Sequence, residues 1–293
     1  LSLHDALPIC DGAEGGGHAA GGGELGTVGA RREGERRAQA HVGELVVGLD
    51  ELAIAHASDL EWQPIAFSPK YSPRSRELIP MHKEFVAYDW SPMSFIFQPS
   101  RVEKPPVTFQ DLLDPRWKQQ IALEDPRTSS PGAQFLTWLF VALGKDGATR
   151  FLTAVRSSVQ SISPSWSAAY GLFKKQQAKL VFSYLTSPVY HWVEEKNQDF
   201  QAAIFNEGHV TQIEYAGIIG RCQQCDLAEQ FVEFLLEPDS QRVLMNKNFM
   251  YPVIAGIEEG TPFKSLPEVK LLAVPGNLNF DEMLALWQKS FGI

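Results

Sequence analysis

From residue 46 onward the chain alternates between short apolar runs and longer segments whose apolar residues recur at helical spacing. Runs such as 180–184 have the length and aromatic or β-branched content of buried strands, whereas 131–143 is long enough for a helix. Strands are predicted at 46–50, 93–97, 121–123, 159–162, 180–184, 202–205 and 210–219. Helices are predicted at 51–57, 108–113, 131–143, 149–156, 167–176, 188–195, 226–235 and 281–290. This alternation is typical of an α/β fold.

The first part of the chain has a different composition from the rest. Phe, Tyr, Trp, Met and Lys are all absent before Trp62, although the chain of 293 residues contains 18 Phe, 7 Tyr and 7 Trp. Gly21–Gly26 matches GxGxxG, but no strand precedes it and no helix follows it, so a dinucleotide site is not favoured. We expect residues 1–45 to be an anomalous Gly- and Arg-rich segment that is disordered or translated in the wrong frame. No signal peptide is recognised in the chain.

Charge and motifs exclude several function classes. The net charge is −9, from 26 basic and 35 acidic residues, which disfavours binding to nucleic acid because phosphates require Lys and Arg. The strongest apolar run, Phe135–Leu143, is too short to span a bilayer. HExxH, GxSxG and the Walker A motif are absent from the sequence, so it predicts neither a metal site nor a catalytic nucleophile paired with a base.

Cys222 and Cys225 form a single CxxC motif just before a predicted helix whose start, Asp226 with Glu229, has the pattern of a capping box. A thioredoxin-like motif would have a characteristic aromatic and proline context, which is missing here. We therefore favour two loop cysteines, which can pair, over a redox site.

The segment 124–132 lies between a predicted strand and the apolar helix. Ser129 or Ser130 can cap this helix, and Pro131 suits its first turn. Free backbone N–H groups and hydroxyls at this position form either an anion site or a plain helix cap.

Aromatic residues gather at the ends of predicted elements in two segments, 166–171 and 183–192. In open α/β sheets, ligands bind beyond the carboxyl ends of strands, and aromatic faces suit a flat or cationic ligand. Core packing is the alternative, and we assign Trp192 to the core.

Six segments together resemble the thiamine-binding periplasmic proteins of ABC importers, in order and spacing, over most of the chain. They are Val46–Asp50, Asp125–Gly132, Trp166–Phe173, Ser183–His191, Phe205–His209 and Met250–Val253. The resemblance implies a two-lobed type II periplasmic-binding-protein fold with a hinge. It implies a first lobe of 46–100 plus 211–293, incomplete at its N-terminus, and a second lobe of 101–210.

The implied function is an extracytoplasmic receptor that captures thiamine or its phosphates between two lobes and delivers them to a membrane permease and its ATPase. The implied protein is a periplasmic monomer without catalysis, cofactor or metal. The ligand contacts carried over from the family are Ser129, Ser130, Trp166, Tyr184, Leu185, Thr186, Ser187 and Tyr190.

The sequence also departs from the family pattern. The family's first strand and an acidic-Gly pair are missing before Val46, Phe249 stands where the family often has Trp, and Trp90 replaces Tyr. Two alternatives stay open. A thiaminase I-like enzyme would need a cysteine nucleophile, but Cys10 lies in the anomalous segment, and Cys222 and Cys225 lie outside the ligand-facing segments. A ferric or other anion receptor would favour a tyrosine pair with little aromatic stacking, whereas Tyr184 and Tyr190 are six residues apart and Trp166 favours an organic ligand.

Overall fold

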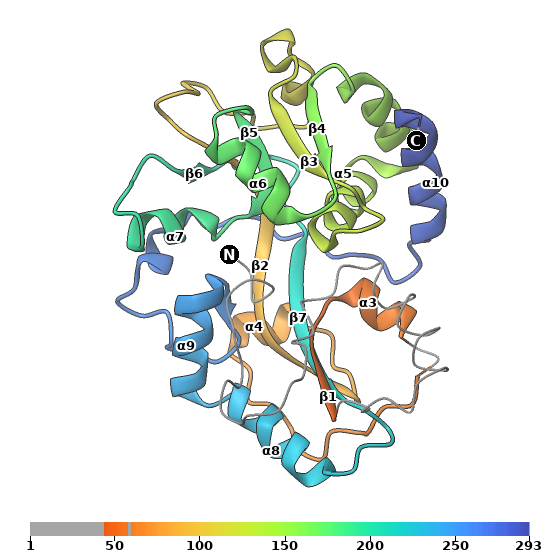
Figure 1. Ribbon diagram of the computed structural model, residues 1–293, viewed down its shortest axis with the longest axis vertical. Coiled ribbons are helices and arrows are strands. Elements are labelled where there is room, and N and C mark those ends of the chain that lie inside the picture. Colours follow the sequence, from red (N-terminus) through yellow and green to blue (C-terminus); the bar gives the residue numbers. More distant parts are fainter. Residues whose placement is uncertain (1–43, 58–59, 293) are drawn as a thin grey trace, which may run out of the picture. The chain divides into compact units, whose positions relative to one another are not determined.

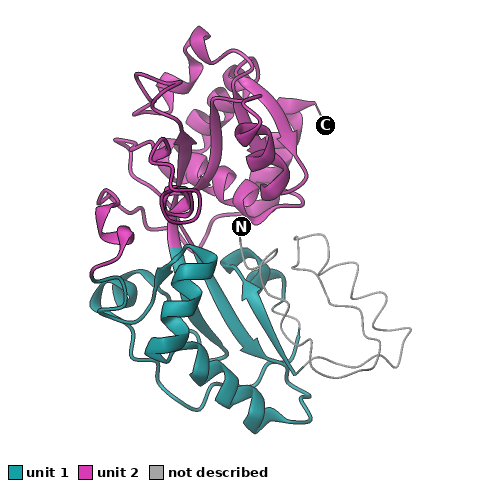
Figure 2. Cartoon of the chain, turned by 60° about the vertical axis from the view of Figure 1, so that its left-hand side comes forward, with its two compact units in different colours: residues 1–90, 213–259 teal, residues 91–212, 260–293 magenta. Residues whose placement is uncertain are grey.

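The computed structural model describes residues 44–57 and 60–292, so the predictions for residues 1–43 lie outside the described residues. The chain divides into two compact units (Figure 2). Unit 1 contains the described residues up to Trp90 together with Ile213–Glu259, and unit 2 contains Ser91–Gln212 together with the described residues from Gly260 onward. Each unit is therefore assembled from segments that are far apart in the sequence.

Unit 1 is built on a small sheet in which β1 (Leu45–Leu49) pairs antiparallel with β7 (Thr211–Ile218), and β7 lies next to β2 (Phe85–Phe97). The short strand β8 (Tyr251–Pro252) pairs with the first part of β2. The helices of this unit are α3 (Glu51–His56), α4 (Pro73–Leu78), α8 (Cys225–Leu235) and α9 (Pro238–Asn248) (Figure 1). Ala228, Val232 and Leu235 of α8 pack against the sheet and close the core of the unit.

The start of α8 differs from the prediction. The Asp226–Glu229 capping box does not form, because the Glu229 carboxylate instead accepts a hydrogen bond from the backbone N–H of Ala66. The carboxylate of Glu44 accepts from the N–H groups of Gln223 and Gln224, which precede the helix. Cys222 and Cys225 form a disulfide in this turn, with Cα atoms 5.3 Å apart.

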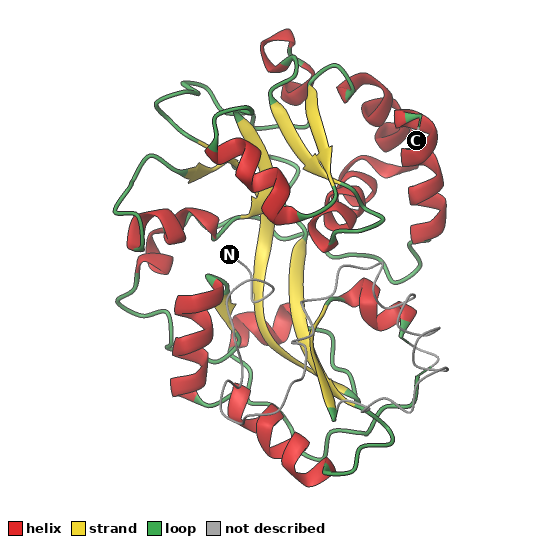
Figure 3. Ribbon diagram, in the orientation of Figure 1, coloured by secondary structure: helices red, strands yellow, loops and turns green. Residues whose placement is uncertain are grey.

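Unit 2 is an open sheet in which the second part of β2 is followed by β5 (Leu180–Tyr184), β3 (Ile121–Glu124) and β4 (Val159–Ser163). β3 is parallel to both β4 and β5, while β2 is antiparallel to β5 and to the short β6 (Gln201–Ala202). Its helices are α5 (Ser130–Val155), α6 (Trp166–Lys174), α7 (Ser187–Val193) and α10 (Phe280–Phe291) (Figure 3). Short 3₁₀ helices occupy Gln110–Leu113, Pro115–Trp117 and Pro262–Ser265.

Strand alternation determines which helix covers each face of this sheet, because successive side chains point to opposite faces. Phe95 and Phe182 are directly paired across β2 and β5, and both rings contact Phe135 of α5. Their neighbours Ile96 and Val181 are also paired, and they pack on the other side in a cluster with Phe173 of α6. The sheet is therefore buried on both faces, as its apolar runs predict.

The C-terminal segment corrects the predicted lobe boundaries. Residues 260–292, which we expected in the first lobe as part of 211–293, belong to unit 2. The amphipathic helix α10 packs along α5, with Trp287 buried and Glu282 paired with Lys145. Burial of this apolar stripe is a tertiary contact that the order of elements along the chain does not reveal.

Most predicted elements are present with small shifts at their ends. The break predicted after residue 143 is found within α5 at Gly144, whose φ of 64° is accessible to glycine but not helical. The helices α4 and α9 and the first half of β2 were not predicted. Within the described part of the chain, none of the helices has the length and apolarity needed to cross a membrane.

Candidate functional site

The predicted ligand segments all follow the carboxyl ends of parallel strands in unit 2. Segment 125–132 follows β3, segment 164–170 follows β4 and segment 185–190 follows β5. Because the three strands are parallel and β3 is the central one, their carboxyl ends lie at the same edge of the sheet. This is the edge at which open α/β sheets bind ligands.

The loop after β3 is held in shape by its own charged residues. The carboxylate of Asp125 accepts from the Arg127 guanidinium at 2.6 Å, 3.0 Å and 3.1 Å, and this ion pair raises the pKa of Arg127. Thr128 Oγ1 donates to the Pro164 carbonyl at 2.7 Å, which ties the loop to the segment after β4. The guanidinium of Arg127 also lies 5.5 Å from the centre of the Trp287 ring. The backbone before α5 is therefore fixed from several directions.

Ser129 and Ser130 lie at the N-terminus of α5. Ser129 is only 3% exposed, and its Oγ has no hydrogen-bond partner among the described residues. Ser130, the first residue of the helix, is half-buried. The helix begins very close to β3, because a Cβ on Gly132 would lie 2.8 Å from backbone atoms of Asp125 and Glu124. Free N–H groups, the helix dipole and an unused hydroxyl together can bind an anion.

The indole of Trp166 is positioned by a pair of serines. Its Nε1–H donates to Ser183 Oγ at 2.8 Å, and Ser183 Oγ lies 2.8 Å from Ser187 Oγ. The Trp166 ring is half-buried, with its centre 4.9 Å from that of Tyr170 and 6.2 Å from that of Tyr184. Ser183 of β5 and Ser187 of α7 therefore hold Trp166, the first residue of α6, in position.

The segment 184–187 is almost entirely buried. The Tyr184 hydroxyl accepts from Gln212 Nε2 at 3.1 Å, and Thr186 Oγ1 lies 3.1 Å from Ser91 Oγ. Leu185 and Thr186 are 0% exposed. The structure thus brings Tyr184 and Ser187 to the surroundings of Trp166, while the side chains of Leu185 and Thr186 face the interior of unit 2.

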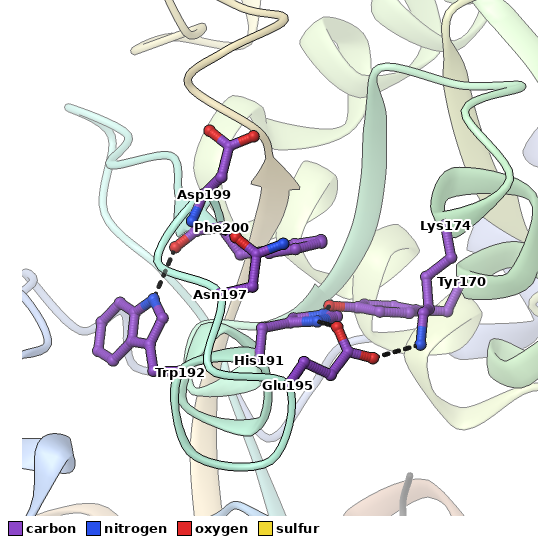
Figure 4. Close-up of polar contacts among 8 residues, drawn as sticks. All are labelled: Tyr170, Lys174, His191, Trp192, Glu195, Asn197, Asp199 and Phe200. Carbon is purple, nitrogen blue, oxygen red and sulfur yellow. Dashed lines mark hydrogen bonds and ion pairs between the residues drawn. The ribbon is translucent and has the colours of Figure 1, made fainter.

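Tyr190 lies on α7, where it is half-buried. Beside it lies a charged network of Lys174, Glu195 and His191, which Figure 4 shows. The ammonium of Lys174, on α6, lies 5.6 Å from the centre of the Tyr190 ring. Lys174 donates to Glu195 at 2.6 Å, and the other oxygen of Glu195 lies 2.6 Å from His191 Nδ1. Sequence reasoning missed this network; the i,i+4 spacing of His191 and Glu195 on a helix was the available signal.

The described residues also show whether a metal could be held and where a carboxyl group is buried. Within residues 44–57 and 60–292, no group of three or more His, Cys, Asp and Glu side chains is placed to hold a metal ion. Glu124, at the end of β3, is 1% exposed, and burial raises the pKa of its carboxyl group well above the usual value.

Two α/β units with polar and aromatic loops at the carboxyl ends of parallel strands are the arrangement of a solute-binding protein. The chain belongs to the family of bacterial extracellular solute-binding proteins, whose model matches residues 63–280. The two-lobed α/β fold predicted from the sequence is confirmed by solved structures. A periplasmic thiamin binding protein is 26% identical with a TM-score of 0.74, over 92% of this chain and 84% of that chain. A ferric binding protein from Campylobacter jejuni shares the fold at 16% identity, with a TM-score of 0.70 over 91% of this chain and 88% of that chain.

The curated relatives are similar in sequence as well. The thiamine-binding periplasmic protein of Salmonella typhimurium is 37% identical over 182 residues, which is 62% of this chain and 55% of that protein. The protein of the same name from Haemophilus influenzae is 31% identical over 217 residues, covering 73% of this chain and 63% of that protein. The match therefore spans little more than half the length of the curated relatives.

Proposed function

We propose that this protein is an extracytoplasmic receptor that binds thiamine or a thiamine phosphate and delivers it to a bacterial ABC importer. The observation that carries the proposal is a combination in unit 2: aromatic faces and a helix N-terminus with an unpartnered serine hydroxyl lie at one edge of a sheet. The relatives named thiamine-binding periplasmic proteins support the same ligand.

The aromatic part of the site suits the organic cation. Thiamine carries a permanently positive thiazolium ring, and cations are attracted to the faces of Trp and Tyr. Trp166 and Tyr190 are both half-buried, so each can offer ring surface to a ligand while its position is held by α6 or α7. Tyr184 and Ser187 support Trp166 from the end of β5 and the start of α7.

The start of α5 suits the phosphate of a phosphorylated ligand. Ser129 and Ser130 offer hydroxyls beside the free N–H groups of the first turn, where negative charge is stabilised by the helix dipole. Ser129 Oγ has no partner among the described residues, so it can donate to a ligand without breaking a bond within the protein.

The proposed activity is binding without cleavage. A cysteine nucleophile would need a free thiol, but both cysteines in the described part of the chain, Cys222 and Cys225, are joined in a disulfide. An iron site would need a tyrosine pair free to coordinate, but the Tyr184 hydroxyl accepts a hydrogen bond from Gln212 and is buried. We propose a periplasmic monomer that needs no cofactor and whose partners are a permease and its ATPase.

Mass spectrometry of the ligand that co-purifies, followed by calorimetric titration with thiamine, thiamine monophosphate and thiamine diphosphate, tests the proposal. We expect at least one of them to bind and to be recovered unchanged after incubation with the protein and an added nucleophile. Binding of ferric iron with no response to any of the three compounds would overturn the proposal. Cleavage of thiamine would instead show an enzyme.

A further inference from the structure

Arg74, on α4, lies against two aromatic rings of unit 1. Its guanidinium carbon is 4.7 Å from the centre of the Trp90 ring and 5.0 Å from that of the Tyr251 ring. Trp90 of β2 and Tyr251 of β8 are paired across the two strands, and their rings stack with centres 5.0 Å apart. Both aromatic residues are buried, whereas Arg74 is exposed. The two rings therefore support a guanidinium that remains open to solvent.

The backbone that carries Arg74 is bonded to the same two strands. The N–H of Ser72 donates to the carbonyl of Val253, directly after β8, at 2.8 Å. The Tyr71 hydroxyl accepts from the N–H of Ala87, on β2, at 2.8 Å. Arg74 is therefore positioned before a ligand arrives, which lowers the conformational cost of binding.

The charge of Arg74 is not neutralised by a carboxylate of the described residues. None of the ion pairs in that part of the chain includes Arg74, and its contacts there are with the two rings. The nearest acid along β2 is Asp89, next to Trp90. Its side chain points to the opposite face of the strand, because successive strand residues alternate, and it accepts from Asn248.

The cations at the candidate site of unit 2 are already paired. Arg127 is bonded to Asp125, and Lys174 to Glu195. The first turn of α5 offers backbone N–H groups and hydroxyls but no charged side chain. A phosphate monoester carries about −1.5 to −2 charges at neutral pH, and its strongest partners are charged donors. Arg74 supplies an unpaired positive charge that the groups of unit 2 do not.

The strand β2 carries both the aromatic pair of Arg74 and a partner of the candidate site. Trp90 is the last residue of unit 1 in this strand, and Met93, three positions further on, is paired with Tyr184. Ser91, directly after Trp90, has its Oγ 3.1 Å from Thr186 Oγ1. The residue that follows the aromatic pair therefore contacts the predicted ligand segment 184–187.

We propose that Arg74 is a specificity-determining residue, which binds an anionic group in unit 1 and gives the receptor a preference for phosphorylated thiamine over free thiamine. A guanidinium can bind phosphate through two parallel hydrogen bonds and stacks on aromatic rings, which Lys does less well. The same charge disfavours a ligand cation at Trp90 and Tyr251, because Arg74 already occupies that position. The preference among thiamine compounds rests on the proposed function, whereas anion binding at Arg74 does not.

Calorimetric titration of the whole chain with thiamine, thiamine monophosphate and inorganic pyrophosphate tests the proposal. We expect the wild type to bind the monophosphate at least about tenfold more tightly than thiamine. Arg74→Gln should weaken binding of the monophosphate and of pyrophosphate by about 10- to 100-fold, as for loss of hydrogen bonds to a charged group. The ratio of the affinities for the monophosphate and thiamine should fall by a similar factor, because free thiamine has no phosphate to bind. Arg74→Lys, which keeps the charge but not the planar group, should lie between Arg74→Gln and wild type.

Arg116→Gln is the matched control. The Arg116 guanidinium also lies over an indole, 4.6 Å from the centre of the Trp117 ring, but it is paired with Asp114 in unit 2. We expect this variant to bind all three compounds as the wild type does.

Several outcomes would overturn the inference: equal affinities of the wild type for thiamine and its monophosphate, an unchanged affinity ratio in Arg74→Gln, or a wild type that binds neither the monophosphate nor pyrophosphate. A different result separates the inference from the proposed function. If the wild type binds pyrophosphate but no thiamine compound, and Arg74→Gln loses pyrophosphate binding, the anion site stands and the proposed function fails.

Discussion

The indole Nε1 of Trp166 lies 2.8 Å from Oγ of Ser183, so the first residue of α6 is bonded to the strand that lies beside β3 in the sheet. The ring is thereby held at the carboxyl edge of the sheet with part of its surface exposed. A ring that is fixed before the ligand arrives loses little conformational freedom on binding, which favours affinity.

Replacement of this ring should weaken ligand binding directly. We expect Trp166→Ala to cost about 1–3 kcal/mol of binding free energy for thiamine, from lost stacking and cation–π attraction. Calorimetric titration measures this loss. Trp62→Phe is the control, since Trp62 is also half-buried with its indole bonded to a carbonyl, but lies in unit 1. Equal affinity of Trp166→Ala and wild type would remove Trp166 from the site.

The two serines at the start of α5 should distinguish phosphorylated from free thiamine. In the double variant Ser129→Ala, Ser130→Ala, we expect the loss of binding free energy to be about 1–3 kcal/mol larger for thiamine monophosphate than for thiamine. Hydrogen bonds to charged groups are the stronger ones. Calorimetric titration of both ligands into the same protein preparation measures the difference, and each ligand serves as the control for the other. A uniform loss for both would show that the phosphate does not lie at this helix.

A methyl group added at two glycines, one in α5 and one in α6, should change the stability of unit 2 in opposite directions. At Gly132 a Cβ would lie 2.8 Å from backbone atoms of β3 and its loop, so Gly132→Ala should destabilise unit 2 by about 1–3 kcal/mol. At Gly171, within α6, nothing lies within 4 Å, and Gly171→Ala should stabilise by about 0.5–1 kcal/mol. Chemical denaturation measures both. Stabilisation by Gly132→Ala would contradict the close approach of α5 to β3.

The buried carboxyl group of Glu124 should make stability depend on pH. Burial raises its pKa well above the ordinary value of 4.5, so folding keeps this group neutral at pH values where the unfolded chain is ionised. A group with a raised pKa stabilises the fold fully below its unfolded pKa and loses that contribution as pH rises toward the folded value. Between those two values the loss is about 1.4 kcal/mol per pH unit.

Glu124→Gln replaces the ionisable carboxyl group with a neutral amide, so it removes this pH-dependent contribution to the free energy of unfolding. Its stability relative to wild type should therefore increase from pH 4 to pH 8, as measured by denaturation at each pH. Glu77→Gln, at an exposed position in unit 1, should follow the wild type throughout. Parallel pH profiles for wild type and Glu124→Gln would show that Glu124 ionises normally in the folded protein.

Local pattern was sufficient for most elements in unit 2. The strand at 180–184 has the predicted bounds, and the break after residue 143 falls at Gly144, because length, side-chain type and glycine act within a few residues. The predicted capping box at Asp226 does not form, because a distant contact overrides the local pattern. The Glu229 carboxylate accepts a hydrogen bond from the N–H of Ala66, 163 positions away in the chain.

The sequence by itself determined the alternating α/β elements and the segments rich in aromatic and hydroxyl groups after the strands, because these depend on neighbouring residues. Only the tertiary structure decided that α10 belongs to unit 2, that Leu185 and Thr186 are buried, and that the Trp166 indole is bonded to Ser183. Those outcomes depend on which distant side chains share a face of the sheet. A local sequence pattern cannot show which buried polar group lacks a hydrogen bond, because its neighbours come from distant parts of the chain. The unpartnered hydroxyl of Ser129 is therefore a property of the folded structure.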